Sequence, residues 1–184
     1  TFGRQFNQSL DGVTLPHCLQ ELTLGERFQQ RLDLVALPTG LQTLSVNYLS
    51  DGLKLPSGLQ TLVFGDIFDN SLEEVTLPPG LKTLTFGHNF NQSLAAVILP
   101  CSLQSLTFGF KFNQLLDGVN LPHGLHTLTF GHLFNSTLDF AALPSSLQEL
   151  RFGHDFNQSV DGVTWPAGLQ TLTFGFHFNQ SLDG

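Results

Sequence analysis

The chain has 184 residues, of which 41% are hydrophobic, and its seven Lys and Arg residues against 15 Asp and Glu give a formal net charge of −8. This balance excludes a groove that follows nucleic-acid phosphates, because such a surface needs clustered Lys and Arg. No apolar run approaches the roughly 18 residues of a membrane-spanning helix, and no signal peptide is recognisable in this stretch.

A repeat of 22 residues, shortened once to 18, runs along the whole chain. The prolines that mark it recur at intervals of 22, 18, 22, 22, 22, 22 and 22 in the numbering, and they are Pro16, Pro38, Pro56, Pro78, Pro100, Pro122, Pro144 and Pro166. A fixed period of this length predicts a solenoid, in which each turn buries its apolar side only by stacking on its neighbours. We therefore expect a single domain over 1–184 with about eight turns, mainly β and irregular, with one parallel β-sheet and little or no helix.

Each repeat contains one segment that alternates apolar and polar residues, as LKTLTF does at 81–86. A period of two predicts a half-buried strand whose central Leu points inward and whose flanking residues point outward. In chain order the outward pairs include Thr43 and Ser45, Thr83 and Thr85, Ser105 and Thr107, Thr127 and Thr129, and Thr171 and Thr173. The third repeat is four residues short, so we expect a tightened convex side in which Tyr48 replaces the missing Phe.

Equivalent residues of stacked turns should form ladders, because neighbouring parallel strands lie about 4.8 Å apart. Two Phe ladders are predicted to fill the core: Phe64, Phe86, Phe108, Phe130, Phe152 and Phe174, and Phe6, Phe28, Phe68, Phe90, Phe112, Phe134, Phe156 and Phe178. An inward asparagine ladder is predicted to satisfy backbone groups at the turns, and it comprises Asn7, Asn91, Asn113, Asn135, Asn157 and Asn179. Trp165 replaces the Leu that precedes Pro elsewhere, so we expect it to be buried.

Pairs of Phe and Asn connect these repeats with a known family. The pairs are Phe90-Asn91, Phe112-Asn113, Phe134-Asn135, Phe156-Asn157 and Phe178-Asn179, and they recur with the Leu-Pro turn and the Leu-x-x-Leu-x-Phe strand. Over the whole chain this pattern resembles the FNIP repeat, a variant of the leucine-rich repeat. The resemblance implies a right-handed leucine-rich-repeat-like coil and a protein-interaction module. Neither end has a polar capping repeat, so we expect a piece of a longer array or ends that meet another copy.

Motifs for catalysis and ligand binding are scarce. The chain has no Gly-rich phosphate loop, zinc-binding spacing or nucleophile motif, so we predict neither an enzyme nor a cofactor site. His132 and His154 stand one repeat apart, about 5 Å in space, and Asp155 could complete a group of three metal ligands. Because no complete tetrahedral set is visible, solvated loop histidines are the favoured interpretation and no metal is predicted.

An acidic column follows the turns at Asp11, Asp33, Asp51, Glu73, Asp117, Asp139, Asp161 and Asp183. Weak calcium binding would relieve the repulsion between like charges on neighbouring turns. The glycine-rich nonapeptide of a calcium β-roll is absent, however, so a solvated edge is the favoured interpretation.

The cysteines and the glycosylation sequons bear on location. Cys18 and Cys101 lie four turns apart, about 19 Å at the strand spacing, which is too far for a disulfide. The sequons begin at Asn7, Asn91, Asn135, Asn157 and Asn179, on the ladder predicted to point inward. Both observations predict a reducing, cytoplasmic location.

The exposed, concave face of the sheet is the predicted partner-binding surface. Its contact residues are predicted to be Thr83, Thr85, Thr107, Thr127, Thr129, Thr171, Thr173, Phe110, His132, His154 and Phe176. Side chains on a rigid sheet present a preorganised surface, so the leading prediction is a non-enzymatic scaffold for a protein or peptide partner. A neutral explanation for the threonines is that Thr is common at exposed strand positions.

Two other functions remain open at this point. Thr-x-Thr arrays on stacked strands are similar to the ice-binding faces of repeat-built antifreeze proteins. The expected curvature and the charged residues Glu21, Glu149 and Arg151 count against a flat match to an ice lattice. A structural repeat protein that assembles end to end is the other alternative.

Overall fold

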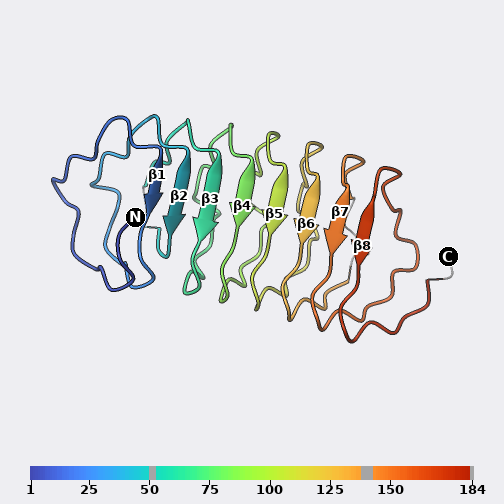
Figure 1. Ribbon diagram of the computed structural model, residues 1–184. Helices are drawn as coiled ribbons and strands as arrows, with labels where there is room; N and C mark the ends of the chain where they lie inside the picture. Colours follow the sequence, from blue (N-terminus) through green and yellow to red (C-terminus); the bar gives the residue numbers. More distant parts are fainter. Residues whose placement is uncertain (50–52, 138–142, 183–184) are drawn as a thin grey trace.

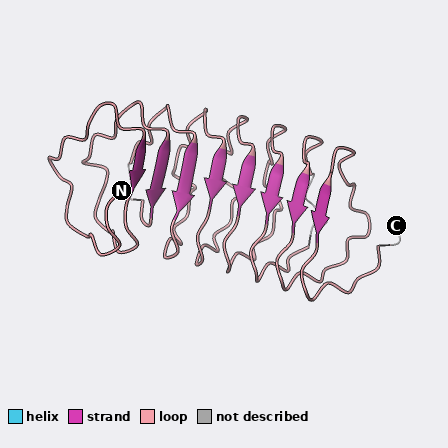
Figure 2. Ribbon diagram, in the orientation of Figure 1, coloured by secondary structure: helices cyan, strands magenta, loops and turns pink. Residues whose placement is uncertain are grey.

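The computed structural model describes residues 1–49, 53–137 and 143–182, and within these ranges the chain is a row of strands joined by irregular turns, without a helix (Figure 1). The strands are β1 Glu21–Thr23, β2 Thr43–Val46, β3 Thr61–Phe64, β4 Thr83–Thr85, β5 Ser105–Thr107, β6 Thr127–Thr129, β7 Glu149–Arg151 and β8 Thr171–Thr173. They form one parallel sheet in sequence order, and Figure 2 shows that loops make up the rest of each turn. The predicted solenoid with one parallel sheet is therefore confirmed.

The strand register follows the repeat. Thr83 pairs with Ser105 and Thr85 with Thr107, so equivalent residues lie side by side across the sheet. The short repeat keeps this register, because Thr43 of β2 pairs with Thr61 of β3 although fewer residues separate them than separate other neighbouring strands. The missing four residues are therefore taken from the connection between the strands.

The core consists of the inward leucines and the two Phe ladders. Rings on consecutive turns lie 5.3–5.6 Å apart in the first ladder and 5.9–6.1 Å apart in the second. Within a turn the two Phe rings stack at 3.7–4.0 Å. Phe6, Phe174 and Phe178 are only partly buried, because they lie in the outermost turns of this chain and are covered from one side.

Two aromatic residues lie elsewhere than predicted. Tyr48 is half-buried, and the residue that enters the core of the short turn is Leu49, with 7% of its surface exposed. The deletion changes which residue of the connection points inward. Trp165 is also half-buried and meets Phe174 edge-on at 6.5 Å. It stands at the rim of the core, where several leucines of the same repeat position are partly exposed as well.

The asparagine ladder forms, but it does not point inward. From Asn7 to Asn157, the amide oxygens accept a hydrogen bond from the backbone N–H of the next turn, as Asn113 does from Asn135 at 2.8 Å. Asp69 takes the same role beneath Asn91, also at 2.8 Å. Because these side chains are exposed or half-exposed, the prediction of a buried ladder is wrong, and the sequons give no argument about location.

The remaining sequence predictions concern the surface. Cys18 and Cys101 are free and exposed, as expected. Asp11, Glu73, Asp117 and Asp161 are exposed, whereas Asp51, Asp139 and Asp183 lie outside the described residues. In the ranges that the structure describes, no helix has the length and apolar character needed to cross a membrane.

Candidate functional site

The sheet exposes one of its faces along the strands. In β4, β5 and β6 the central Leu is buried and both neighbours are half-exposed, as the alternating pattern predicted. The structure brings Thr83, Thr85, Thr107, Thr127 and Thr129 together on these three adjacent strands. Thr171 and Thr173 of β8 face the same way but lie beyond β7, where Glu149 and Arg151 form an ion pair.

A ladder of glycines, with Asn47 in their place in the short repeat, ends the strand segments and brings the turns close together. A Cβ atom on Gly131 would lie 1.6 Å from the carbonyl oxygen of Gly109, and one on Gly153 would lie 1.7 Å from that of Gly131. Only a residue without a side chain fits such an approach. The glycines therefore set the spacing of the residues that follow them.

The residues after these glycines form a ring ladder, which consists of His88, Phe110, His132, His154 and Phe176. Successive ring centres are 4.6, 4.5, 4.3 and 5.2 Å apart, and the ring planes lie within 12° of parallel. The ladder includes all four ring residues predicted as contacts and adds His88. Its members are accessible, since Phe110 is 38% and Phe176 is 81% exposed.

The same ladder position carries charged side chains nearer the N-terminus. Arg4 and Glu26 form an ion pair at 2.7 Å, and the Asp66 carboxylate accepts a hydrogen bond from the backbone N–H of His88. Beside these residues the sheet face is hollowed over about 390 Å³, with Thr23 and Thr85 in the lining. The face thus runs from an acidic, hollowed end to an aromatic end.

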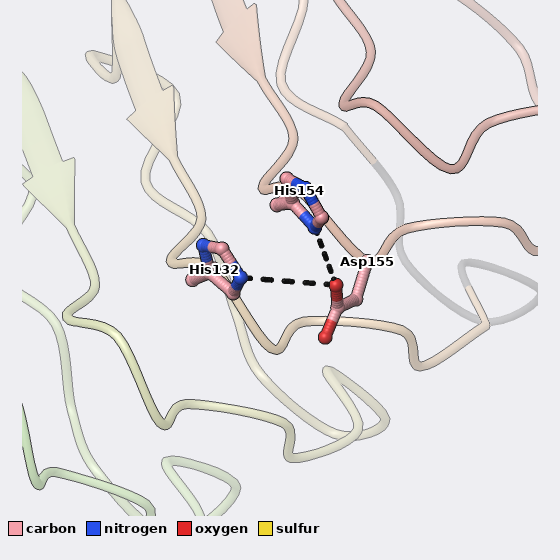
Figure 3. A group of neighbouring side chains, drawn as sticks. All are labelled: His132, His154 and Asp155. Carbon is pink, nitrogen blue, oxygen red and sulfur yellow. Dashed lines mark hydrogen bonds and ion pairs between the residues drawn. The ribbon is translucent and has the colours of Figure 1, made fainter.

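At the aromatic end, histidines surround one carboxylate, as Figure 3 shows for His132, His154 and Asp155. Asp155 Oδ1 lies 2.7 Å from His154 Nδ1 and 3.9 Å from His132 Nε2. It also lies 3.9 Å from Nε2 of His177, a residue that the sequence analysis missed. The signal for it was its place one repeat after Asp155. The hydrogen bond with His154 is the main cause that lowers the pKa of Asp155, and desolvation opposes it.

Comparison with known proteins finds a matching family and a similar solved structure. The family model described as FNIP Repeat matches residues 6–48, 68–111 and 112–155. A solved structure described as that of CroV588, a novel circular LRR protein, matches with a TM-score of 0.88 and 41% sequence identity over 99% of this chain. The match covers 27% of that protein, so this chain spans about a quarter of its length.

No curated protein matches the chain. The matched repeats include the ring-ladder residues from His88 to His154 and the strands β4, β5 and β6. On the family match and the shared leucine-rich-repeat-like fold, the chain belongs to the FNIP repeat family.

Proposed function

We propose that this chain is part of a non-enzymatic interaction scaffold that binds a protein or peptide along its exposed sheet face. A leucine-rich-repeat-like array of this family supports a protein-interaction or structural role in general. The observation that carries the more specific proposal is the ring ladder, an exposed row of aligned rings beside an uncharged array of threonines.

The ring ladder suits binding because its side chains are ordered before a partner arrives. Phe110 lies between the rings of His88 and His132, so its rotamer is restrained by contacts on both faces. Ordering a free side chain on binding costs about 0.5–1.5 kcal/mol, and much of that cost is avoided here. Exposed aromatic rings are enriched in the central parts of interfaces, and the neighbouring threonine hydroxyls can donate and accept hydrogen bonds.

Charge favours a basic partner. The chain carries a net charge of −8, and Glu26 and Asp66 line the hollow at one end of the face. Opposite charges on two surfaces steer their encounter and disfavour wrong partners. We therefore propose a protein or peptide that offers apolar side chains to the ring ladder and Lys or Arg to the acidic end.

The cellular location and the assembly of the chain are proposed from its cysteines and from the similar solved structure. Free thiols at Cys18 and Cys101 favour a reducing compartment, and we propose a cytoplasmic location on that basis. The similar solved structure is described as circular, and by analogy this chain would contribute one arc to a larger wall of strands. Self-association through the ends of the array is compatible with this proposal.

Ice binding has less support. The threonine array is continuous over β4, β5 and β6, but β7 interrupts it with the Glu149–Arg151 ion pair, and β1 begins with Glu21. Charged side chains disturb a regular array of hydroxyl and methyl groups. Thermal hysteresis of the purified chain tests this alternative directly.

The proposal is tested by capture from native extract with the wild-type chain and two charge-matched variants. Thr85→Lys/Thr129→Lys adds two positive charges to the sheet face. Ile98→Lys/Leu115→Lys adds two charges at exposed residues outside the strands and the ring ladder. A specific protein that binds the wild type and the second variant but not the first is the expected result.

Two readouts complete the test. Melting temperatures of both variants should stay close to wild type, because the altered side chains are exposed or half-exposed. Hydrogen exchange of the complex should then show protection over β4, β5 and β6. Capture that is equal for both variants, or protection only outside the sheet face, would contradict the proposal.

A further inference from the structure

Four potential metal ligands meet at the C-terminal end of the ring ladder. One nitrogen of each of three histidines, His132, His154 and His177, lies within 2.7–3.9 Å of the same carboxylate oxygen of Asp155. Ligand atoms of His132, His154 and Asp155 all lie within 4.8 Å of one another. The ring of His177 meets that of His154 edge-on at 4.7 Å, so it adjoins the group from the next turn.

The backbone register holds these residues together. His132 and His154 are one repeat apart, and so are Asp155 and His177. The N–H of Asp155 donates to the carbonyl of His132 at 3.0 Å, and the N–H of His177 donates to the carbonyl of His154 at 3.0 Å. Two neighbouring columns of the solenoid therefore place two ligands each on consecutive turns.

Ring stacking alone does not account for this group. At the ring-ladder position Phe110 and Phe176 stack as well as histidine does, at 4.5 Å and 5.2 Å from their neighbours. In the adjacent column, the turns before Asp155 carry Asn89, Lys111 and Leu133, so stacking requires neither a carboxylate nor an imidazole there. Along these turns, residues that can bind a metal occur in both columns only where their side chains can reach one another.

The distances are close to those of a bound zinc ion. With metal–ligand bonds of about 2.0–2.1 Å, ligand atoms at the corners of a tetrahedron lie roughly 3.3 Å apart. The separations of 2.7 and 3.9 Å from Asp155 Oδ1 bracket this value, and ligand atoms of His132, His154 and Asp155 lie up to 4.8 Å apart before a metal binds. Small side-chain rotations would bring the atoms into place, and each of these side chains is between 33% and 55% exposed, which leaves an entry path.

We propose that His132, His154, His177 and Asp155 bind a divalent transition-metal ion with the chemistry of Zn²⁺. Imidazole nitrogen and carboxylate oxygen are ligands that Zn²⁺ accepts in a four-coordinate site. Without metal, His154 Nδ1–H donates to the Asp155 carboxylate. Metal binding replaces this hydrogen bond, and the imidazole remains neutral because its proton moves to Nε2.

The ring ladder itself supplies the matched variants. His154→Phe removes a ligand and keeps a ring of the kind that stacks at Phe110 and Phe176. His88→Phe makes the same change in the same ladder, away from the cluster. Asp155→Asn removes the charge of the shared carboxylate with little change in shape.

Calorimetric titration of Zn²⁺ into the chain, with no affinity tag, tests the proposal. The expected result is one saturable site per chain, weakened roughly tenfold or more by His154→Phe and by Asp155→Asn and unchanged by His88→Phe. Co²⁺ in place of Zn²⁺ should give the intense visible absorption of four-coordinate cobalt in the wild type and in His88→Phe, but not in His154→Phe or Asp155→Asn. Circular dichroism confirms that the variants remain folded.

Three results would overturn the proposal. They are the absence of saturable Zn²⁺ binding, an affinity that His154→Phe leaves unchanged, and equal weakening by His88→Phe, which would mean that scattered surface histidines bind the ion. Partner capture is read separately with Asp155→Asn, because this variant leaves every ring of the ring ladder unchanged.

Discussion

Replacement of Gly131 by Ala tests how closely the turns approach beneath the ring ladder. The added Cβ would lie 1.6 Å from the carbonyl oxygen of Gly109, whereas an ordinary carbon–oxygen contact is about 3.3 Å. The two turns would have to separate locally by about 1.7 Å, roughly a third of the 4.8 Å between strands. This shift would break the 2.9 Å hydrogen bond from the N–H of Leu133 to the carbonyl of Phe110.

The expected cost combines two terms. Overpacking against a backbone that cannot rotate away costs about 1–3 kcal/mol, and the lost hydrogen bond adds about 1 kcal/mol. Gly131→Ala should therefore lower the free energy of unfolding by about 2–4 kcal/mol. Urea denaturation followed by circular dichroism measures it. The same variant should also weaken partner capture, because Phe110 and His132 would be forced apart.

Gly80→Ala is the matched control. Its Cβ would meet Ser57 O at 3.7 Å, an ordinary contact, and Ser102 and Ser146 occupy the same repeat position. Its free energy of unfolding should stay within about 0.5 kcal/mol of wild type. If Gly131→Ala is as stable as Gly80→Ala, the close approach of the turns is wrong, and with it the explanation of the ring spacing.

Three further predictions concern the ladders and the rim of the core. Asn113→Ala should cost about 1 kcal/mol in urea denaturation, because the next turn loses a hydrogen-bond acceptor, whereas Asn113→Asp should cost less since Asp69 already fills that role. Phe112→Ala should cost about 3–5 kcal/mol because the ring is fully buried, and an effect no larger than that of Phe176→Ala would contradict the core assignment. The fluorescence of Trp165 should be only partly blue-shifted and open to acrylamide quenching; complete protection would mean that the indole is buried.

Position along the solenoid axis was predictable from the repeat. A constant period converts directly into register, so the two Phe ladders and the outward threonines could be assigned from the sequence alone. The same rule predicted that His132 and His154 are neighbours. Where the period changes, the rule fails, as the half-buried Tyr48 and the buried Leu49 of the short repeat demonstrate.

Whether a side chain points into the core or toward the surface was harder to predict. The asparagines follow a fully buried Phe, and alternation alone cannot tell whether the chain has already reached the surface. Their oxygens accept hydrogen bonds from the next turn outside the core, so the expected cost of Asn113→Ala falls from that of a buried unpaired group to that of exposed hydrogen bonds. His177, by contrast, was predictable from the period, because it lies one repeat after Asp155 in the same column.

The glycine ladder explains how the site can vary while the fold stays constant. Since the backbone alone sets the spacing, the next residue is free to be charged near the N-terminus, as in Glu26 and Asp66, and a ring from His88 onward. The two proposals use different properties of these side chains, because partner binding depends on stacked rings and metal binding on ring nitrogens. Asp155→Asn should weaken Zn²⁺ binding and preserve partner capture, because it leaves every ring of the ring ladder in place. If it weakens both, the metal ion is part of the interaction surface and the two activities belong to one site.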